Sequence, residues 1–101
     1  MNQITPAALQ ERIDSHQSFQ LIDVREPAEH NSFNIGGDLI PLGEIMDRKD
    51  LIQRDKPVVL YCKMGIRSQI AIQRLQEKYG FTNIYNLQGG IERWKKEISH
   101  G

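Results

Sequence analysis

The segment that most constrains the fold is the nearly unbroken apolar run PVVLYC at residues 57–62. A continuous run of this kind is typical of a central strand in a parallel sheet, because such a strand is covered on both faces. A helix is predicted from Arg67, since apolar residues recur at helical spacing and Gly80 stands where a C-terminal cap glycine belongs. The buried side of this helix is predicted to hold Ser68, Ala71, Ile72, Leu75 and Tyr79.

Weaker strand and helix signals alternate through the rest of the chain. Strands are predicted at residues 19–24, 39–40 and 84–87. Helices are predicted after Thr5-Pro6, from Pro27 toward Phe33, over about residues 42–53, and after Gly89-Gly90 with Ile91, Trp94 and Ile98 toward the core. This alternation predicts an open α/β sheet. Because 101 residues are about the size of one domain, a single domain over residues 1–101 is expected.

The composition argues against several classes of partner. Thirteen basic residues balance thirteen acidic ones, so the net charge gives no reason to expect nucleic acid or an anionic membrane. No apolar run approaches the ~20 residues that span a bilayer, and the N-terminus lacks the pattern of a secretory signal. A single cysteine cannot form an internal disulfide, so a reducing, cytoplasmic location is expected.

The loop CKMGIRS at residues 62–68 joins the apolar strand to the helix. Backbone N–H groups at a helix start converge on one point and favour an anion there. In open α/β sheets, ligands bind in such crevices at the carboxyl ends of the strands. Cys62 stands at the mouth of this crevice, Lys63 and Arg67 add positive charge, and Gly65 permits a tight loop. We therefore predict that the thiolate form of Cys62 is favoured.

Cys62 also has a simpler interpretation as a small buried side chain, the usual state of a free cysteine. Burial alone does not require Gly65, Arg67 and an immediate helix start, so a reactive cysteine is favoured. A dithiol redox enzyme needs a second cysteine. The chain's three histidines are scattered and form no local motif for a cysteine protease or a metal site: His16, His30 and His100. A thiolate that attacks a phosphoryl group or a sulfane sulfur remains.

The spacing between Cys62 and Arg67 separates these two electrophiles. Four residues lie between them: Lys63, Met64, Gly65 and Ile66. Cysteine phosphatases, as a family, have one residue more, because their loop must enclose a tetrahedral oxyanion. A smaller ring suits a single terminal sulfur, so sulfane sulfur is favoured over phosphorus.

Four segments in order resemble the rhodanese-like sulfurtransferase family over nearly the whole chain. They are LIDVREPAEH (21–30), NIGGDLIPLGEI (34–45), CKMGIRS (62–68) and NLQGGIERW (86–94). The second is similar to the form found in rhodanese domains attached to molybdopterin- and thiamine-pathway adenylyltransferases. Asn34 stands where the family often has histidine. Because that residue is not the nucleophile, the departure concerns local structure rather than chemistry.

The resemblance implies a parallel five-stranded sheet flanked by helices on both faces. It also implies a persulfide intermediate on Cys62, with the backbone amides of residues 63–67 around the outer sulfur. Thiosulfate or a protein persulfide would donate, sulfite or a free thiol would leave, and a thiophilic acceptor would take the sulfur. No metal and no organic cofactor are implied.

Three charged residues near Cys62 each have two interpretations. Arg25 either adds positive potential near an anion or forms a structural ion pair with Asp23. We favour the ion pair, because rim charges usually support the scaffold. Arg67 either contacts the sulfonate of thiosulfate or pairs with a carboxylate such as Glu26 or Asp23, and neither interpretation is favoured.

The other loop side chains are also open to two interpretations. Lys63 is a candidate contact for substrate charge or an ordinary surface lysine. Met64 and Ile66 form a docking surface for a protein or an apolar acceptor, or one of them packs under the loop. Packing is favoured more for Ile66 than for Met64.

Three functions follow from these features. The favoured one is a sulfurtransferase of the thiosulfate sulfurtransferase type, with Cys62 as nucleophile and sulfur carrier and residues 63–67 as the substrate-binding loop. The second is a cysteine-dependent phosphatase or arsenate reductase on the same fold, against which the four-residue spacing argues. The third is a non-catalytic binding module in which the loop recognises a partner.

Overall fold

The computed structural model describes residues 2–98, which form a five-stranded parallel sheet flanked by helices. The strand order is β1-β5-β4-β2-β3, and every neighbouring pair is parallel. The strands are β1 Asn2–Ile4, β2 Gln20–Asp23, β3 Asp38–Leu39, β4 Val58–Tyr61 and β5 Ile84–Leu87. The prediction of a central apolar strand is confirmed, because β4 lies in the middle of the sheet and all of its residues are buried.

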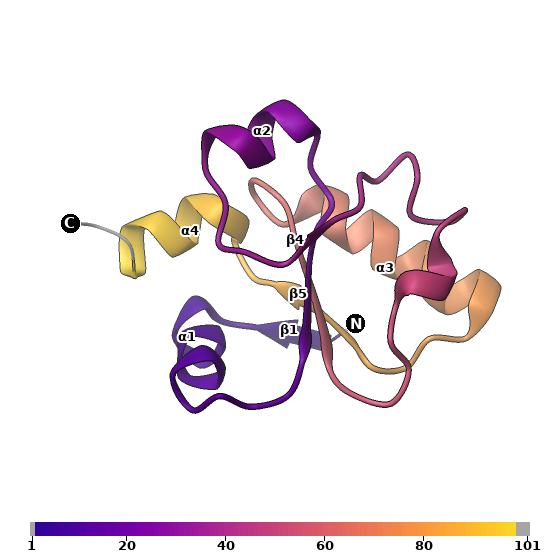
Figure 1. Ribbon diagram of the computed structural model, residues 1–101, viewed down its shortest axis with the longest axis horizontal. Helices are drawn as coiled ribbons and strands as arrows, with labels where there is room; N and C mark the ends of the chain where they lie inside the picture. The colour runs from indigo at the N-terminus through magenta and orange to yellow at the C-terminus, as the bar shows by residue number, and fades with distance from the viewer. Residues whose placement is uncertain (1, 99–101) are drawn as a thin grey trace.

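Helices cover both faces of the sheet (Figure 1). They are α1 Pro6–Asp14, α2 Pro27–Ser32, α3 Ile66–Tyr79 and α4 Gly90–Glu97, with a short 3-10 helix, η1, at Lys49–Leu51. Side chains alternate along β4, so Val59 and Tyr61 pack with α1 and α4, while Val58 and Leu60 pack with α3. The five-stranded α/β architecture implied by the resemblance is confirmed.

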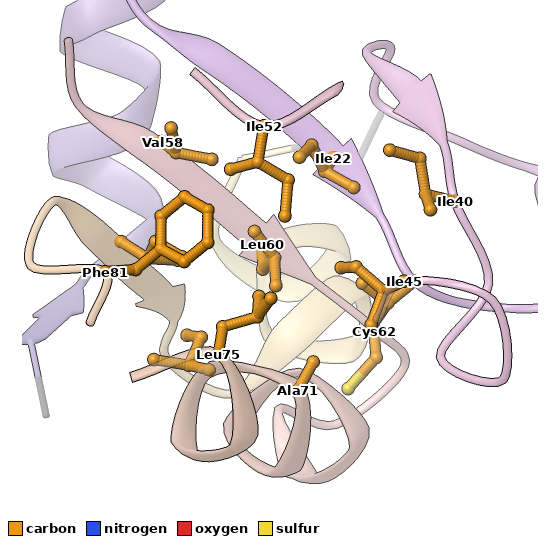
Figure 2. Packing of buried hydrophobic residues seen from close by; sticks show 13 residues of the cluster. Ile22, Ile40, Ile45, Ile52, Val58, Leu60, Cys62, Ala71, Leu75 and Phe81 are labelled. Carbon is orange, nitrogen blue, oxygen red and sulfur yellow. The ribbon is translucent and has the colours of Figure 1, made fainter. Parts of the chain in front are cut away.

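The helix predicted over residues 42–53 is wrong. This segment consists of turns that end in η1, and most of its backbone hydrogen bonds span three residues, as in Glu44 N–H to Pro41 O and Ile52 N–H to Lys49 O. Gly43 and the aspartates of this segment are weak helix formers. The apolar spacing nevertheless corresponds to burial, because Ile45 and Ile52 are both buried against β4 and α3 (Figure 2).

Two smaller differences concern the edge strands. Strand β1 was not predicted, because only Ile4 of its three residues is buried. Strand β3 begins one residue before its predicted position.

Among residues 2–98, no helix has the length and apolar character to cross a bilayer. The cytoplasmic location stays a prediction.

Candidate active site

The connection from β4 to α3 places Cys62 immediately after the central strand. Tyr61 ends the strand, and α3 begins at Ile66, so only four residues form the turn. Gly65 caps the helix with a φ of 90°, in the left-handed region that side chains rarely adopt. Glycine is therefore required for the chain to turn directly from strand into helix.

The Cys62 sulfur is buried among apolar side chains on one side and contacted by polar groups on the other. Cys62 is only 1% exposed and belongs to the core beside Ala71 of α3 (Figure 2). The backbone N–H of Gly65 lies 3.1 Å from Sγ, and that of Ser68 lies 3.4 Å away. N–H groups aimed at one sulfur stabilise negative charge on it. Thus the sulfur faces loop amides, and one of them belongs to Ser68, just beyond the range implied by the resemblance.

A hollow of about 270 Å³ opens beside the sulfur. Its lining residues are Cys62, Lys63, Met64, Ile66 and Arg67. Met64 is 60% exposed and Ile66 is 63% exposed, so both apolar side chains stand at the rim. The prediction that one of them, most of all Ile66, packs under the loop is wrong. Ile66 and Ile70 are one turn apart on the outward side of α3.

A second hollow of about 410 Å³ lies on the other side of Lys63, between α2 and α4. Charged side chains and Phe33 line it, including Arg25, Glu29, Lys63, Glu92 and Lys95. Lys63 therefore borders both hollows, which gives its exposed ammonium group access to either one.

Arg67 lines the hollow beside Cys62 and pairs with Glu29 of α2. Its two terminal nitrogens lie 2.7 and 2.9 Å from the two Glu29 oxygens, a bidentate geometry. The sequence suggested Glu26 or Asp23 as the partner. Neither is used, because Asp23 is occupied by Arg25 and Glu26 caps the start of α2. The hydrogen bonds from Arg67 lower the pKa of Glu29 to about 2 despite partial burial.

This ion pair predicts a pH-dependent contribution to stability. The folded-state pKa of Glu29 is about 2 and its ordinary value is 4.5, so the stabilisation is complete above the ordinary value and is lost as the pH falls toward 2. Glu29→Gln is expected to lower the free energy of unfolding by about 0.5–1 kcal/mol at neutral pH, since the pair is partly exposed. Urea unfolding at several pH values measures the difference.

The control for this experiment is Glu77→Gln, at an exposed position of α3 where the carboxylate accepts a hydrogen bond from Gln73 and forms no ion pair within residues 2–98. The difference in free energy of unfolding between Glu77→Gln and wild type should lack the pH dependence that comes from the ion pair of Glu29 with Arg67. A Glu29→Gln difference that stays constant down to about pH 2 would contradict the assigned pair.

Arg25 and Asp23 form a buried ion pair at the end of β2. The guanidinium contacts both Asp23 oxygens, its Nη2 donates to Phe33 O at 2.6 Å, and His30 Nδ1 lies 2.9 Å from Asp23 Oδ2. Burial raises the pKa of Asp23, but the hydrogen bonds from Arg25 and His30 outweigh it and hold the pKa below its usual value. The favoured interpretation of Asp23 and Arg25 as a structural pair agrees with this geometry.

Histidine and asparagine residues near α2 have structural contacts. His30 pairs with Asp23, and Asn34 accepts from Gly36 N–H and donates to His30 O, so it fixes the turn after α2. The departure at Asn34 therefore concerns local structure, as expected. His16 follows α1 with a φ of 54°, and His100 lies outside the described residues.

The start of α4, at Gly89 and Gly90, holds the loop in place, which the sequence did not indicate. The N–H groups of Ile91 and Glu92 donate to Cys62 O and Lys63 O at 2.9 and 3.0 Å. A Cβ on Gly90 would lie 2.6 Å from Cys62 O and 2.5 Å from Lys63 O. Only a residue without a side chain allows α4 to approach the loop this closely.

Comparison with known proteins identifies the family. The sequence model of the rhodanese-like domain matches residues 5–97. The chain belongs to the rhodanese-like domain family. A rhodanese-related protein of Thermoplasma volcanium has the same fold, with a TM-score of 0.83 and 31% identity over 97% of this chain and 94% of that one.

Several bacterial relatives resemble this rhodanese-like domain in sequence. The uncharacterized protein YqhL of Bacillus subtilis is 48% identical over 82% of this chain and 66% of its own length. A protein of Allochromatium vinosum named sulfurtransferase is 34% identical over 95% of this chain and 90% of its own length. The probable adenylyltransferase/sulfurtransferase MoeZ of Mycobacterium tuberculosis is 41% identical over 94% of this chain. The chain spans only 25% of the length of MoeZ.

Proposed function

We propose that this chain is a sulfurtransferase that carries sulfane sulfur as a persulfide on Cys62. The observation that supports this most directly is the position of the Cys62 sulfur, which faces the N–H groups of Gly65 and Ser68 at the start of α3. Membership of the rhodanese-like family and the relatives named sulfurtransferase support the same function. We also propose that residues 1–101 form one such domain, because the family match extends from residue 5 to residue 97.

The proposed reaction has two displacement steps. The Cys62 thiolate attacks the outer sulfur of thiosulfate, a new S–S bond forms on Sγ, the S–S bond of thiosulfate breaks, and sulfite leaves with the electron pair. A nucleophilic acceptor then attacks the outer sulfur of the persulfide. The S–S bond to Sγ breaks, and Cys62 leaves as a thiolate beside the loop amides, which stabilise its charge in both steps.

The charges around the hollow favour one positive contact for a small anion. Arg67 is paired with Glu29 and Arg25 with Asp23, so their charges are largely compensated within the fold. Among the ion pairs of residues 2–98, Lys63 has no carboxylate partner, and it borders the hollow. We therefore assign Lys63, rather than Arg67, as the contact for the sulfonate of thiosulfate.

The test of the proposed function is sulfur transfer from thiosulfate to cyanide, with thiocyanate as the measured product. The wild-type protein should form thiocyanate from thiosulfate, and it should not hydrolyse an aryl phosphate offered in place of thiosulfate. Turnover of the aryl phosphate that disappears in Cys62→Ser would instead support the phosphatase alternative.

A protein is proposed as the second class of sulfur donor or acceptor. Met64 and Ile66 are exposed at the rim of the hollow, and Ile70 is exposed one turn further along α3. A small anion needs no such surface, whereas apolar side chains next to a reactive group are typical of a protein contact.

Ile70→Gln tests the protein contact without altering the loop. Lysate proteins are trapped as mixed disulfides on Cys62 by a thiol oxidant such as diamide, which takes up the two electrons, and the yield is expected to fall about threefold to tenfold in Ile70→Gln, as for a residue at the edge of an interface. Thiosulfate turnover should stay unchanged. Leu51→Gln is the matched control, because Leu51 is also exposed but lies on η1. An equal yield from both variants would contradict the assigned surface.

A further inference from the structure

A buried chain of hydrogen bonds runs from the Cys62 sulfur to the edge of the sheet at β1. Ser68 Oγ lies 3.4 Å from Sγ, and its hydroxyl donates to Asn86 Oδ1. Asn86 Nδ2 in turn donates to Gln3 Oε1 at 3.0 Å. Ser68 and Asn86 are both completely buried, so no solvent replaces these contacts.

The direction of each bond in this chain follows from the groups available. The Asn86 amide directs its NH₂ group at the Gln3 oxygen, so its own oxygen faces Ser68 and accepts. Ser68 has a single hydroxyl hydrogen, and the hydroxyl donates it in the hydrogen bond to Asn86 Oδ1. The Ser68 oxygen therefore presents a lone pair to Sγ, which suits a Cys62 thiol that donates its S–H.

Ionisation of Cys62 changes the preferred position of this hydrogen. A thiolate has no S–H to donate and accepts hydrogen bonds instead, so the lone pair of Ser68 Oγ would face a negative sulfur. Rotation of the Ser68 hydroxyl supplies a donor to Sγ but leaves the buried Asn86 oxygen without one, which is unfavourable. Cys62 and Asn86 therefore compete for one hydrogen.

We propose that Ser68 is a catalytic residue that stabilises the Cys62 thiolate through its hydroxyl, and that Asn86 is a positioning residue that opposes this by holding the same hydrogen. The proposal deepens the proposed function and rests on it for the transfer steps. In the second step, where Cys62 leaves as a thiolate, the Ser68 hydroxyl turns to Sγ as the S–S bond breaks. No proton is exchanged with solvent, because the hydroxyl only changes its acceptor.

The two residues are predicted to act with opposite signs. Ser68→Ala removes the donor, so the pH midpoint for alkylation of Cys62 by iodoacetamide should move up, and the rate at neutral pH should fall on the order of tenfold. Asn86→Val removes the competing acceptor, so the midpoint should move down and alkylation at low pH should be several-fold faster. Val suits a central strand position and introduces no new acceptor.

Two further variants separate this effect from damage to the fold. The double variant Ser68→Ala/Asn86→Val should behave like Ser68→Ala, because without the hydroxyl there is no hydrogen for Asn86 to hold. Ser68→Thr keeps the hydroxyl and should restore the wild-type midpoint. Midpoints that move in the same direction for both single variants, or an unchanged midpoint in Ser68→Ala, would overturn the proposal.

Alkylation and sulfur transfer report on different claims. If the midpoints move as predicted but no variant, wild type included, accepts sulfur from thiosulfate, the proposed function fails while the role of Ser68 toward the thiolate stands. If sulfur is accepted but the midpoints do not move, the role of Ser68 fails alone. Ser68→Ala should also slow the release of sulfur to cyanide more than the loading from thiosulfate.

Discussion

Replacement of Cys62 by serine is expected to abolish sulfur transfer while leaving the fold intact. A serine hydroxyl does not form a persulfide, so thiocyanate formation should fall on the order of 10³-fold or more, to the uncatalysed background. The fold should tolerate the change, because a serine oxygen accepts from the Gly65 and Ser68 N–H groups as the sulfur does. The loss of apolar contact in the core should cost about 1 kcal/mol.

Steady-state kinetics and urea unfolding of Cys62→Ser measure the two parts of this prediction. A non-catalytic binding module predicts a different result, since partner binding and the cellular phenotype would then survive in Cys62→Ser. Residual thiocyanate formation near the wild-type rate would contradict the assignment of Cys62 as nucleophile.

Replacement of Gly90 by alanine is expected to give the second large effect. The new Cβ would lie 2.5–2.6 Å from the carbonyl oxygens of Lys63 and Cys62, so the backbone of either α4 or the loop must move. Displacement of the loop moves the amides away from the sulfur, and an error of about 1 Å in a catalytic group costs about 100-fold in rate. Together with the strain at a φ of +62°, the free energy of unfolding should fall by about 3 kcal/mol or more.

Gly80→Ala is the matched control for backbone strain. Gly80 has a φ of +69°, and a Cβ there would meet nothing within 4 Å. Its stability should fall by about 1–2 kcal/mol from strain alone, with no change in sulfur transfer. Equal loss of stability and full activity in both variants would show that the approach of α4 to the loop is not important for the site.

The sequence predicted those parts of the fold that depend on local pattern. The apolar run at 57–62 predicted β4, because burial on both faces gives a continuous apolar run. The stripe ending at Gly80 predicted α3, because burial on one side gives apolar residues at helical spacing. The helix predicted over residues 42–53 is absent because turns also bury Ile45 and Ile52 at this spacing. Strand β1 is short and lies at the edge, so a single buried residue, Ile4, gave no pattern to detect.

The sequence predicted where Cys62 and Gly65 lie in the fold, but not the contacts around them. Cys62 and Gly65 follow from the local geometry of strand, turn and helix. The partner of Arg67 depends on how α2 is rotated against α3, which no local pattern specifies. The same holds for the bond from Ser68 to Asn86 and for the approach of Gly90 to the loop, since both join segments that are distant in sequence.

The most direct test of a persulfide on Cys62 is the intact mass of the protein after incubation with thiosulfate. Wild type is expected to gain the mass of one sulfur atom, cyanide should remove it, and peptide mapping should place it on Cys62. Cys62→Ser should gain nothing under the same conditions. No gain in wild type, or a gain that persists in Cys62→Ser, would contradict a persulfide on Cys62.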